Sequence, residues 1–196
     1  MKKTVQNFSK QNPIIAVIVI GDEILSGKTL EANSHFLTRL LTRHAFSVHI
    51  VSIIADKEDE IVGQVQCAIK TADIVIITGG LGPTPDDITR YAVARAVGRP
   101  LVVFPAQERI IKRKLKHTAR KLFAVSKVEA LLPAGSCPIE NGVGMAPGFR
   151  VDEQKAVLFC IPGVPEEAQY MAERTIIPYL IAHYRPLPMV HHIIKT

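Results

Sequence analysis

Residues 14–23 have the sequence IIAVIVIGDE, in which seven consecutive apolar residues, most of them β-branched, end in a polar turn. The run does not alternate between apolar and polar residues, so it predicts a strand that is buried on both faces. Strands of this kind belong to parallel sheets that helices cover on both sides. The segment therefore predicts an α/β protein, with Asp22 and Glu23 at the carboxyl end of an inner strand.

The rest of the chain repeats this alternation of strand and helix. Further apolar runs predict strands at residues 48–54, 73–78, 101–104 and 156–161. Apolar residues at helical spacing predict helices that begin at a capping Asn33, at 56, at Asp86 or Asp87, at Pro105 and at 166. Because strands and helices alternate along the chain, we predict an α/β fold with a mostly parallel sheet.

Length and composition limit the class of protein. The 196 residues fit one domain, which we place at 13–196, after a mobile tail at 1–12 and with a loop-rich excursion around 125–150. Hydrophobic residues make up 47% of the chain and charged residues 21%, which argues against a disordered or fibrous protein. The longest apolar run has seven residues, whereas a membrane-spanning helix needs about 20. We expect a cytoplasmic protein without membrane contact.

The net charge of +6 comes largely from a basic stretch at residues 109–121. Apolar residues between the charges predict an amphipathic surface helix, and the lack of interleaved aromatic residues argues against nucleic-acid binding. The three cysteines Cys67, Cys137 and Cys160 are odd in number and far apart, so they form neither a disulfide framework nor a zinc site. We expect free, mostly buried thiols.

The loop after the third strand, GGLGPTPDD at residues 79–87, is the most informative candidate site. Its glycines let the main chain approach a ligand closely, and a helix that begins at Asp86 or Asp87 would direct N–H groups at a phosphate. The two aspartates would bind Mg²⁺ or another divalent cation that bridges to that phosphate. The alternative interpretation is a tight turn with an aspartate helix cap.

A second acidic pair, Asp22 and Glu23, follows the first strand. If the first and third strands are neighbours, these carboxylates could share the cation, and the alternative is a solvated turn. Gly27-Lys28-Thr29 resembles the end of a phosphate-binding P-loop, but Asp22 stands where that motif needs its first glycine. We predict no P-loop and keep Lys28 as a contact for an anionic ligand.

Taken together and in order, these motifs resemble the MoaB/Mog molybdopterin-binding family, and within it the N-terminal domain of CinA, the competence/damage-inducible protein. The matching segments are residues 21–27, Asn33, 78–89, 146–149 and 162–165. The similarity extends from about residue 14 to about residue 180. It implies a three-layer α/β/α fold and a homo-oligomer, here as a standalone domain without the second domain of CinA, which deamidates nicotinamide mononucleotide.

The resemblance also implies a ligand and an activity. In pterin-binding relatives the glycine loop holds molybdopterin or its adenylylated form. In CinA-like relatives the domain is associated with metal-dependent hydrolysis of nucleotide diphosphates such as ADP-ribose or FAD. The implied function is therefore that of a metal-dependent pyrophosphatase acting on a small nucleotide-like ligand, and the alternative is a non-hydrolytic molybdopterin-binding module. No haem, flavin or zinc site is expected.

The candidate residues, from the motifs and the resemblance together, fall into two sets. The catalytic candidates are Asp86, Asp87 and Glu23, with Asp86 and Asp87 as metal ligands. The candidates for binding ligand and phosphate are Gly21, Asp22, Ser26, Lys28, Asn33, Thr78, Gly79, Gly80, Leu81, Gly82, Pro83, Thr84, Pro147 and Gly148. Water is the expected attacking group. Met145 stands where relatives often have threonine or lysine, so a polar contact to the ligand is lost there.

Overall fold

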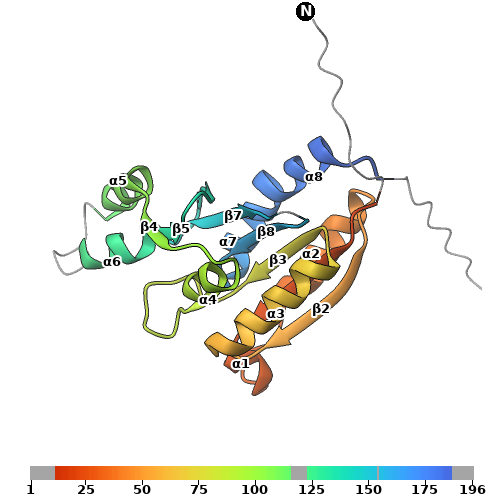
Figure 1. Ribbon diagram of the computed structural model, residues 1–196, viewed down its shortest axis with the longest axis horizontal. Helices are drawn as coiled ribbons and strands as arrows, with labels where there is room; N and C mark the ends of the chain where they lie inside the picture. Colours follow the sequence, from red (N-terminus) through yellow and green to blue (C-terminus); the bar gives the residue numbers. More distant parts are fainter. Residues whose placement is uncertain (1–11, 116–122, 154, 187–196) are drawn as a thin grey trace, which may run out of the picture.

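The computed structural model describes residues 12–115, 123–153 and 155–186 (Figure 1). The tail predicted at 1–12 lies almost wholly outside these ranges, as does the end of the basic stretch. The strands are β1 (Ile15–Ile20), β2 (Val48–Ile54), β3 (Ile74–Thr78), β4 (Leu101–Val103), β5 (Leu131–Pro133), β6 (Cys137–Ile139), β7 (Gly148–Asp152) and β8 (Val157–Ile161). The helices are α1 (Asp22–Leu25), α2 (Asn33–Arg43), α3 (Glu58–Thr71), α4 (Thr89–Ala96), α5 (Pro105–Lys114), α6 (Phe123–Glu129), α7 (Pro165–Met171) and α8 (Ile177–His183), with a π-helical segment at Ala172–Ile176.

Six strands form the main sheet, in the order β2-β1-β3-β8-β7-β6. The first four are parallel, and β7 and β6 continue the sheet in antiparallel pairing. The predicted α/β fold with a mostly parallel sheet is therefore confirmed. The short strand expected at 101–104 forms, as β4, but it pairs with β5 in a separate two-stranded sheet.

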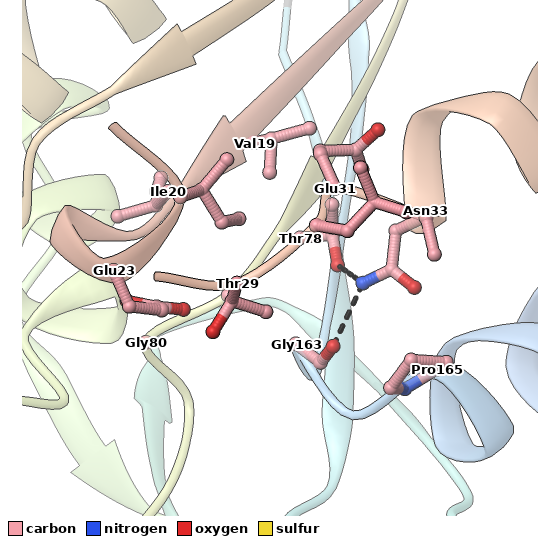
Figure 2. A pocket seen from close by; sticks show the side chains of 14 residues that line it. Val19, Ile20, Glu23, Thr29, Glu31, Asn33, Thr78, Gly80, Gly163 and Pro165 are labelled. Carbon is pink, nitrogen blue, oxygen red and sulfur yellow. Dashed lines mark hydrogen bonds between the residues drawn. The ribbon is translucent and has the colours of Figure 1, made fainter. Parts of the chain in front are cut away.

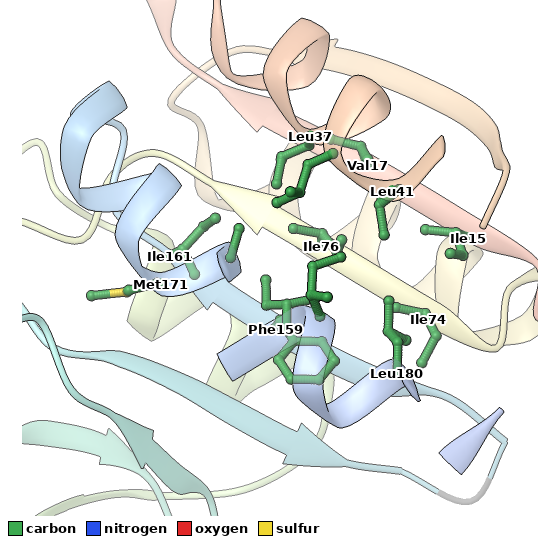
Figure 3. Packing of buried hydrophobic residues seen from close by; sticks show 14 of the residues in the cluster. Ile15, Val17, Leu37, Leu41, Ile74, Ile76, Phe159, Ile161, Met171 and Leu180 are labelled. Atoms are coloured by element: carbon green, nitrogen blue, oxygen red, sulfur yellow. The ribbon is translucent and has the colours of Figure 1, made fainter. Parts of the chain in front are cut away.

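Helices cover both faces of the main sheet, so the molecule has three layers (Figure 1). Side chains alternate along β1 because successive residues of a strand point to opposite faces. Ile15, Val17 and Val19 pack with α2, α7 and α8, in the cluster that Figure 3 shows. Ala16 and Ile18 pack on the other face with α3 and α4. This double burial explains why the run in 14–20 is apolar throughout.

The C-terminal helix is interrupted, although the sequence predicts one continuous helix over 166–183. α7 passes through the π-helical segment Ala172–Ile176 into α8. Pro178 lies in the first turn of α8 and has no N–H, so the regular helical hydrogen bond to the preceding turn cannot form there. The π segment keeps the chain helical across this point, and Ile177 and Leu180 reach the core.

The polar turn expected after the first strand forms the single helical turn α1, at residues 22–25. One local expectation is corrected. The thiols are mostly exposed: Cys67 and Cys137 reach the surface, and only Cys160 is buried, in the central strand β8. Cys67 lies on the solvent-exposed side of α3. The helical spacing of apolar residues does not require a buried side chain at that position. No helix in the described ranges is long and apolar enough to cross a membrane.

Candidate functional site

The glycine loop that follows β3 lies beside the carboxyl ends of β1 and β8, its two neighbours in the sheet. Gly79 has a φ of 112°, and a Cβ there would lie 2.2 Å from the carbonyl oxygen of Ile20 at the end of β1. On the other side, its N–H donates to the Ile161 carbonyl at the end of β8, over 3.2 Å. Only glycine fits this position, because both the left-handed backbone and the close approach exclude a side chain.

The next residues present main-chain donors. Gly80 also has a positive φ, 62°, and a Cβ there would lie 2.3 Å from the buried hydroxyl of Thr89. Among the described residues, none accepts a hydrogen bond from the N–H groups of Gly80, Leu81 or Gly82. Main-chain N–H groups in protein interiors are almost always paired, and successive free ones form concave anion-binding sites. A loop with such donors can donate hydrogen bonds from its N–H groups to an anion.

Asn33 joins the ends of two strands to the start of α2. Its amide nitrogen donates to the Thr78 hydroxyl over 3.0 Å and to the Gly163 carbonyl over 2.8 Å (Figure 2). The Thr78 hydroxyl in turn donates to the Pro162 carbonyl over 2.8 Å. The predicted capping role is therefore wrong, because the helix has Ala32 at its N-cap and the amide is used to hold β3 and β8 in register at the site.

Two cavities meet at the glycine loop and share Gly80 and Gly163. The smaller, about 150 Å³, lies between the loop and the start of α2, and Glu23, Asn33 and Thr78 line it (Figure 2). The larger, about 460 Å³, has a mostly apolar wall and falls in the size range of small-molecule sites. Its lining residues are Gly80, Leu81, Gly82, Pro83, Asp87, Glu129, Gly144, Met145, Ala146, Pro162, Gly163, Val164 and Glu167.

Four carboxylates gather beside the loop. Asp22 and Asp56 exchange hydrogen bonds: the Asp22 amide donates to Asp56 Oδ2 over 2.9 Å, and the Asp56 amide to Asp22 Oδ1 over 3.3 Å. Burial raises the pKa of the Asp56 carboxyl, and the negative charges of three neighbours add to this: Asp22, Glu23 and Asp87. The expectation that the acidic pair after β1 lies near the glycine loop is confirmed, because β1 and β3 are adjacent.

The aspartates of the loop differ from their predicted placement. α4 begins at Thr89, so Asp86 and Asp87 precede the helix and neither caps it. Asp87 Oδ2 instead accepts hydrogen bonds from the Thr84 amide over 2.9 Å and from the Thr84 hydroxyl over 2.5 Å, which closes a turn. Asp87 lines the larger cavity, whereas Asp86 is exposed and lines neither.

Two buried charged residues lie behind the loop. Arg90 and Glu129 are each 1% exposed. The Arg90 guanidinium donates to the carbonyl oxygens of Leu81, Gly82 and Val128, which fixes the glycine loop against the end of α6. Glu129 Oε2 has no hydrogen-bond partner in the described part of the chain. Burial raises the pKa of Glu129 to about 7, against the opposing effect of the Arg90 charge.

Comparison with known proteins agrees with this architecture. A family model described as "Probable molybdopterin binding domain" matches residues 16–182. The chain belongs to this MoaB/Mog molybdopterin-binding domain family. A competence-damage inducible protein of Halothermothrix orenii is 35% identical over 167 residues, which are 85% of this chain and 40% of that protein. A CinA-like protein of Flavobacterium psychrophilum is 33% identical over 92% of this chain and 43% of its own length. The chain spans about two fifths of the length of these relatives.

Solved structures of the MoaB/Mog family share the fold. The protein CinA of Thermoplasma acidophilum matches with a TM-score of 0.76 and 32% identity, over 83% of this chain and 95% of that one. MoaB of Pyrococcus furiosus, described as a tungsten cofactor synthesizing protein, matches with a TM-score of 0.56 and 17% identity, over 89% and 98%. The second likeness concerns the fold alone.

Within this family fold, the predicted site residues separate into three groups. Those that line a cavity are Glu23, Asn33, Thr78, Gly79, Gly80, Leu81, Gly82, Pro83 and Asp87. Those in the adjoining turns are Gly21, Asp22 and Thr84. Those that lie outside these turns and line neither cavity are Ser26, Lys28, Asp86, Pro147 and Gly148. Gly148 has a packing role, because a Cβ there would lie 2.6 Å from the Cys160 carbonyl of the adjacent strand.

Several site residues escaped the sequence reasoning. Asp56 follows the end of β2, so the rule that selected Asp22 at the end of β1 would also have selected it. Glu129 and Glu167, which line the larger cavity, come from helices whose pattern does not distinguish them from exposed glutamates. Met145 lines the same cavity and also packs against Ile111 and Leu115, so its apolar side chain has a structural partner.

Proposed function

We propose that this edge of the sheet binds a phosphorylated small molecule with a planar ring, and that it cleaves the diphosphate of a nucleotide-like ligand by metal-dependent hydrolysis. The observation that carries the proposal is the row of free N–H groups at Gly80, Leu81 and Gly82, next to a cavity of about 460 Å³. Phosphate oxygens accept hydrogen bonds from such donors, and the main chain holds them in place before the ligand arrives.

The acidic residues support a divalent cation as cofactor. Burial raises the pKa of Asp56, and the negative charges of Asp22, Glu23 and Asp87 add to this effect, so a bound cation would relieve their mutual repulsion. Among the described residues, no group of three His, Cys, Asp or Glu side chains converges as a complete ligand set. Mg²⁺ fits such a site, because it is usually held by one or two carboxylates together with waters and substrate phosphates. Glu23 and Asp87, at the walls of the two cavities, are the proposed ligands.

The chain's own residues would position the reaction. The amides of Gly80, Leu81 and Gly82 would hold one phosphate and stabilise the charge that develops on it. Asp56, whose pKa is raised, would accept a hydrogen bond from the attacking water and orient it. The bound cation would supply charge neutralisation on the phosphoryl oxygens and a lower pKa for the water.

The test is to incubate the protein with ADP-ribose, FAD or GDP in the presence of Mg²⁺, Mn²⁺ or Co²⁺ and to follow the products by phosphorus NMR. We expect cleavage that a chelator abolishes and that Asp87→Asn reduces at least tenfold. Asp86→Asn is the matched control, because Asp86 lines neither cavity and is expected to leave the rate unchanged. Absence of cleavage with every substrate and metal would refute hydrolysis.

A non-hydrolytic molybdopterin-binding role is the second candidate. It is favoured by the family description and by the apolar wall of the larger cavity, which suits a pterin ring. Calorimetry with a pterin phosphate and with ADP-ribose separates the two candidates. Binding of the pterin phosphate without turnover of any diphosphate would support the second candidate, and failure of the pterin phosphate to bind would exclude it.

A further inference from the structure

The larger cavity is lined by a buried carboxylate with an oxygen that has no hydrogen-bond partner among the described residues. Glu129 lines this cavity and is 1% exposed, yet its Oε2 has no hydrogen-bond partner among the residues described. A buried polar atom without a partner costs about 1–3 kcal/mol, so such atoms are rare and mark places where a ligand or an ordered water binds. Asp87 has its Oδ2 engaged by Thr84, and Glu167 accepts a hydrogen bond from Asn141, so their positions are already fixed.

The walls around Glu129 show which part of a ligand would lie against it. Three carboxylates line the cavity, from Asp87, Glu129 and Glu167, and they repel phosphate. The phosphate therefore belongs at the amides of the glycine loop, which have no acceptor among the described residues, and the part of the ligand that lies against Glu129 is its ring. The remaining wall is apolar and includes Leu81, Pro83, Met145, Ala146, Pro162 and Val164, which suits the flat face of a heterocycle.

We propose that Glu129 is the residue that selects the ring of the ligand, and that it favours a ring with an amide N–H next to an amino group, as in guanine and pterin, over adenine. This inference rests on the phosphate-binding role proposed above. A carboxylate can accept one hydrogen bond on each oxygen from these two adjacent donors. The adenine edge offers one amino group flanked by ring nitrogens that are themselves acceptors, so one carboxylate oxygen would face a lone pair.

The test compares GDP with ADP, which have the same ribose and diphosphate and differ only in the ring. Calorimetry at pH 8 is expected to show GDP bound roughly tenfold or more tightly than ADP, the discrimination typical of one bidentate contact. Glu129→Gln is expected to abolish or reverse this preference, because an amide offers one donor and one acceptor and so matches adenine. Glu166→Gln, which removes the same charge from an exposed position nearby, is expected to keep it.

A measurement on the unaltered protein covers the case in which Glu129→Gln does not fold. The groups that influence Glu129 are Arg90 on α4, Asp87 in the loop and Glu167 on α7, and together with burial they hold its pKa at about 7. The ratio of the ADP to the GDP dissociation constant should therefore rise between pH 6 and pH 8, as the carboxylate ionises. Titration of the phosphates affects both ligands alike and cancels in this ratio.

The possible outcomes separate the two proposals. Equal binding of GDP and ADP, a ratio that does not change with pH, or a GDP preference that survives in Glu129→Gln would overturn the role of Glu129 while the phosphate site stands. If GDP, ADP and inorganic pyrophosphate all fail to bind, the proposed function falls and the ring selection falls with it. A preference for GDP that depends on both pH and Glu129 supports both.

Discussion

Replacing Gly79 by alanine is expected to destabilise the protein severely, because this residue brings three strand ends together. An alanine in the left-handed region costs about 1–2 kcal/mol. The new Cβ would also lie 2.2 Å from the carbonyl oxygen of Ile20, a main-chain atom of a buried strand that cannot move aside alone. Overpacking of this kind adds about 1–3 kcal/mol, so we expect a total loss of about 3 kcal/mol or more.

Urea unfolding followed by circular dichroism measures this loss. With a denaturant dependence of about 2–3 kcal/mol per molar, the midpoint should fall by about 1 M or more. The matched control is Gly27→Ala, where φ is also positive (73°) but no atom lies within 4 Å of the new Cβ. This control should lose only about 1 kcal/mol. If the two variants unfold at the same urea concentration, the close approach to Ile20 does not constrain the loop and our reasoning about the site is refuted.

Three further outcomes follow from the described contacts. Asn33→Ala removes the two hydrogen bonds between α2 and the strand ends and should cost about 2–3 kcal/mol, and a melting temperature within a degree of the parent would contradict this. Because folding raises the pKa of Glu129 from 4.5 to about 7, its contribution to stability is present below pH 4.5 and is lost as the pH rises through 7. The free energy of unfolding, measured with urea, should therefore fall between pH 5 and pH 8, and this fall should be roughly 2 kcal/mol smaller in Glu129→Gln than in the parent protein. Equal falls in the two proteins would disprove this. A thiol reagent should modify two cysteines quickly in the native protein and Cys160 only after unfolding, and fast reaction of all three would show that β8 is not buried.

The layers of the fold could be predicted from the sequence because parallel strands buried on both faces have a distinctive composition. The apolar runs of β1, β3 and β8 identified the centre of the sheet, and the polar residues that follow them identified the edge where the candidate site lies. The same logic placed Glu23 beside the glycine loop, which depends only on β1 and β3 being neighbours. These predictions need strand order and strand direction but no side-chain geometry.

The parts of the site that sequence reasoning missed depend on contacts between distant segments. A helix was expected to begin at Asp86 or Asp87, but the Thr84 hydroxyl and amide donate hydrogen bonds to the Asp87 carboxylate and close a turn, so the helix begins only at Thr89. The burial of Glu129 arises only when α6 packs behind the glycine loop, held there by Arg90. No local pattern in residues 123–129 predicts that contact, since a glutamate at the end of a short helix is normally exposed.

The π-helical segment Ala172–Ile176 has a consequence for how length changes in this region would be tolerated. A π turn contains one residue more than a regular α-helical turn, and each residue of an α-helix advances by about 100° around the axis. Because the π turn takes up its extra residue within about one full rotation, deleting one residue there would restore α-helical winding and leave the downstream residues in nearly the same rotational phase. Deleting one residue from the regular turns of α7 would instead rotate everything downstream by that angle. Ile177 and Leu180, which pack in the core cluster with residues of β3 and β8, would then swing toward water. The irregular turn is thus the place in the last helix where the loss of one residue is compatible with the packing of this face of the sheet.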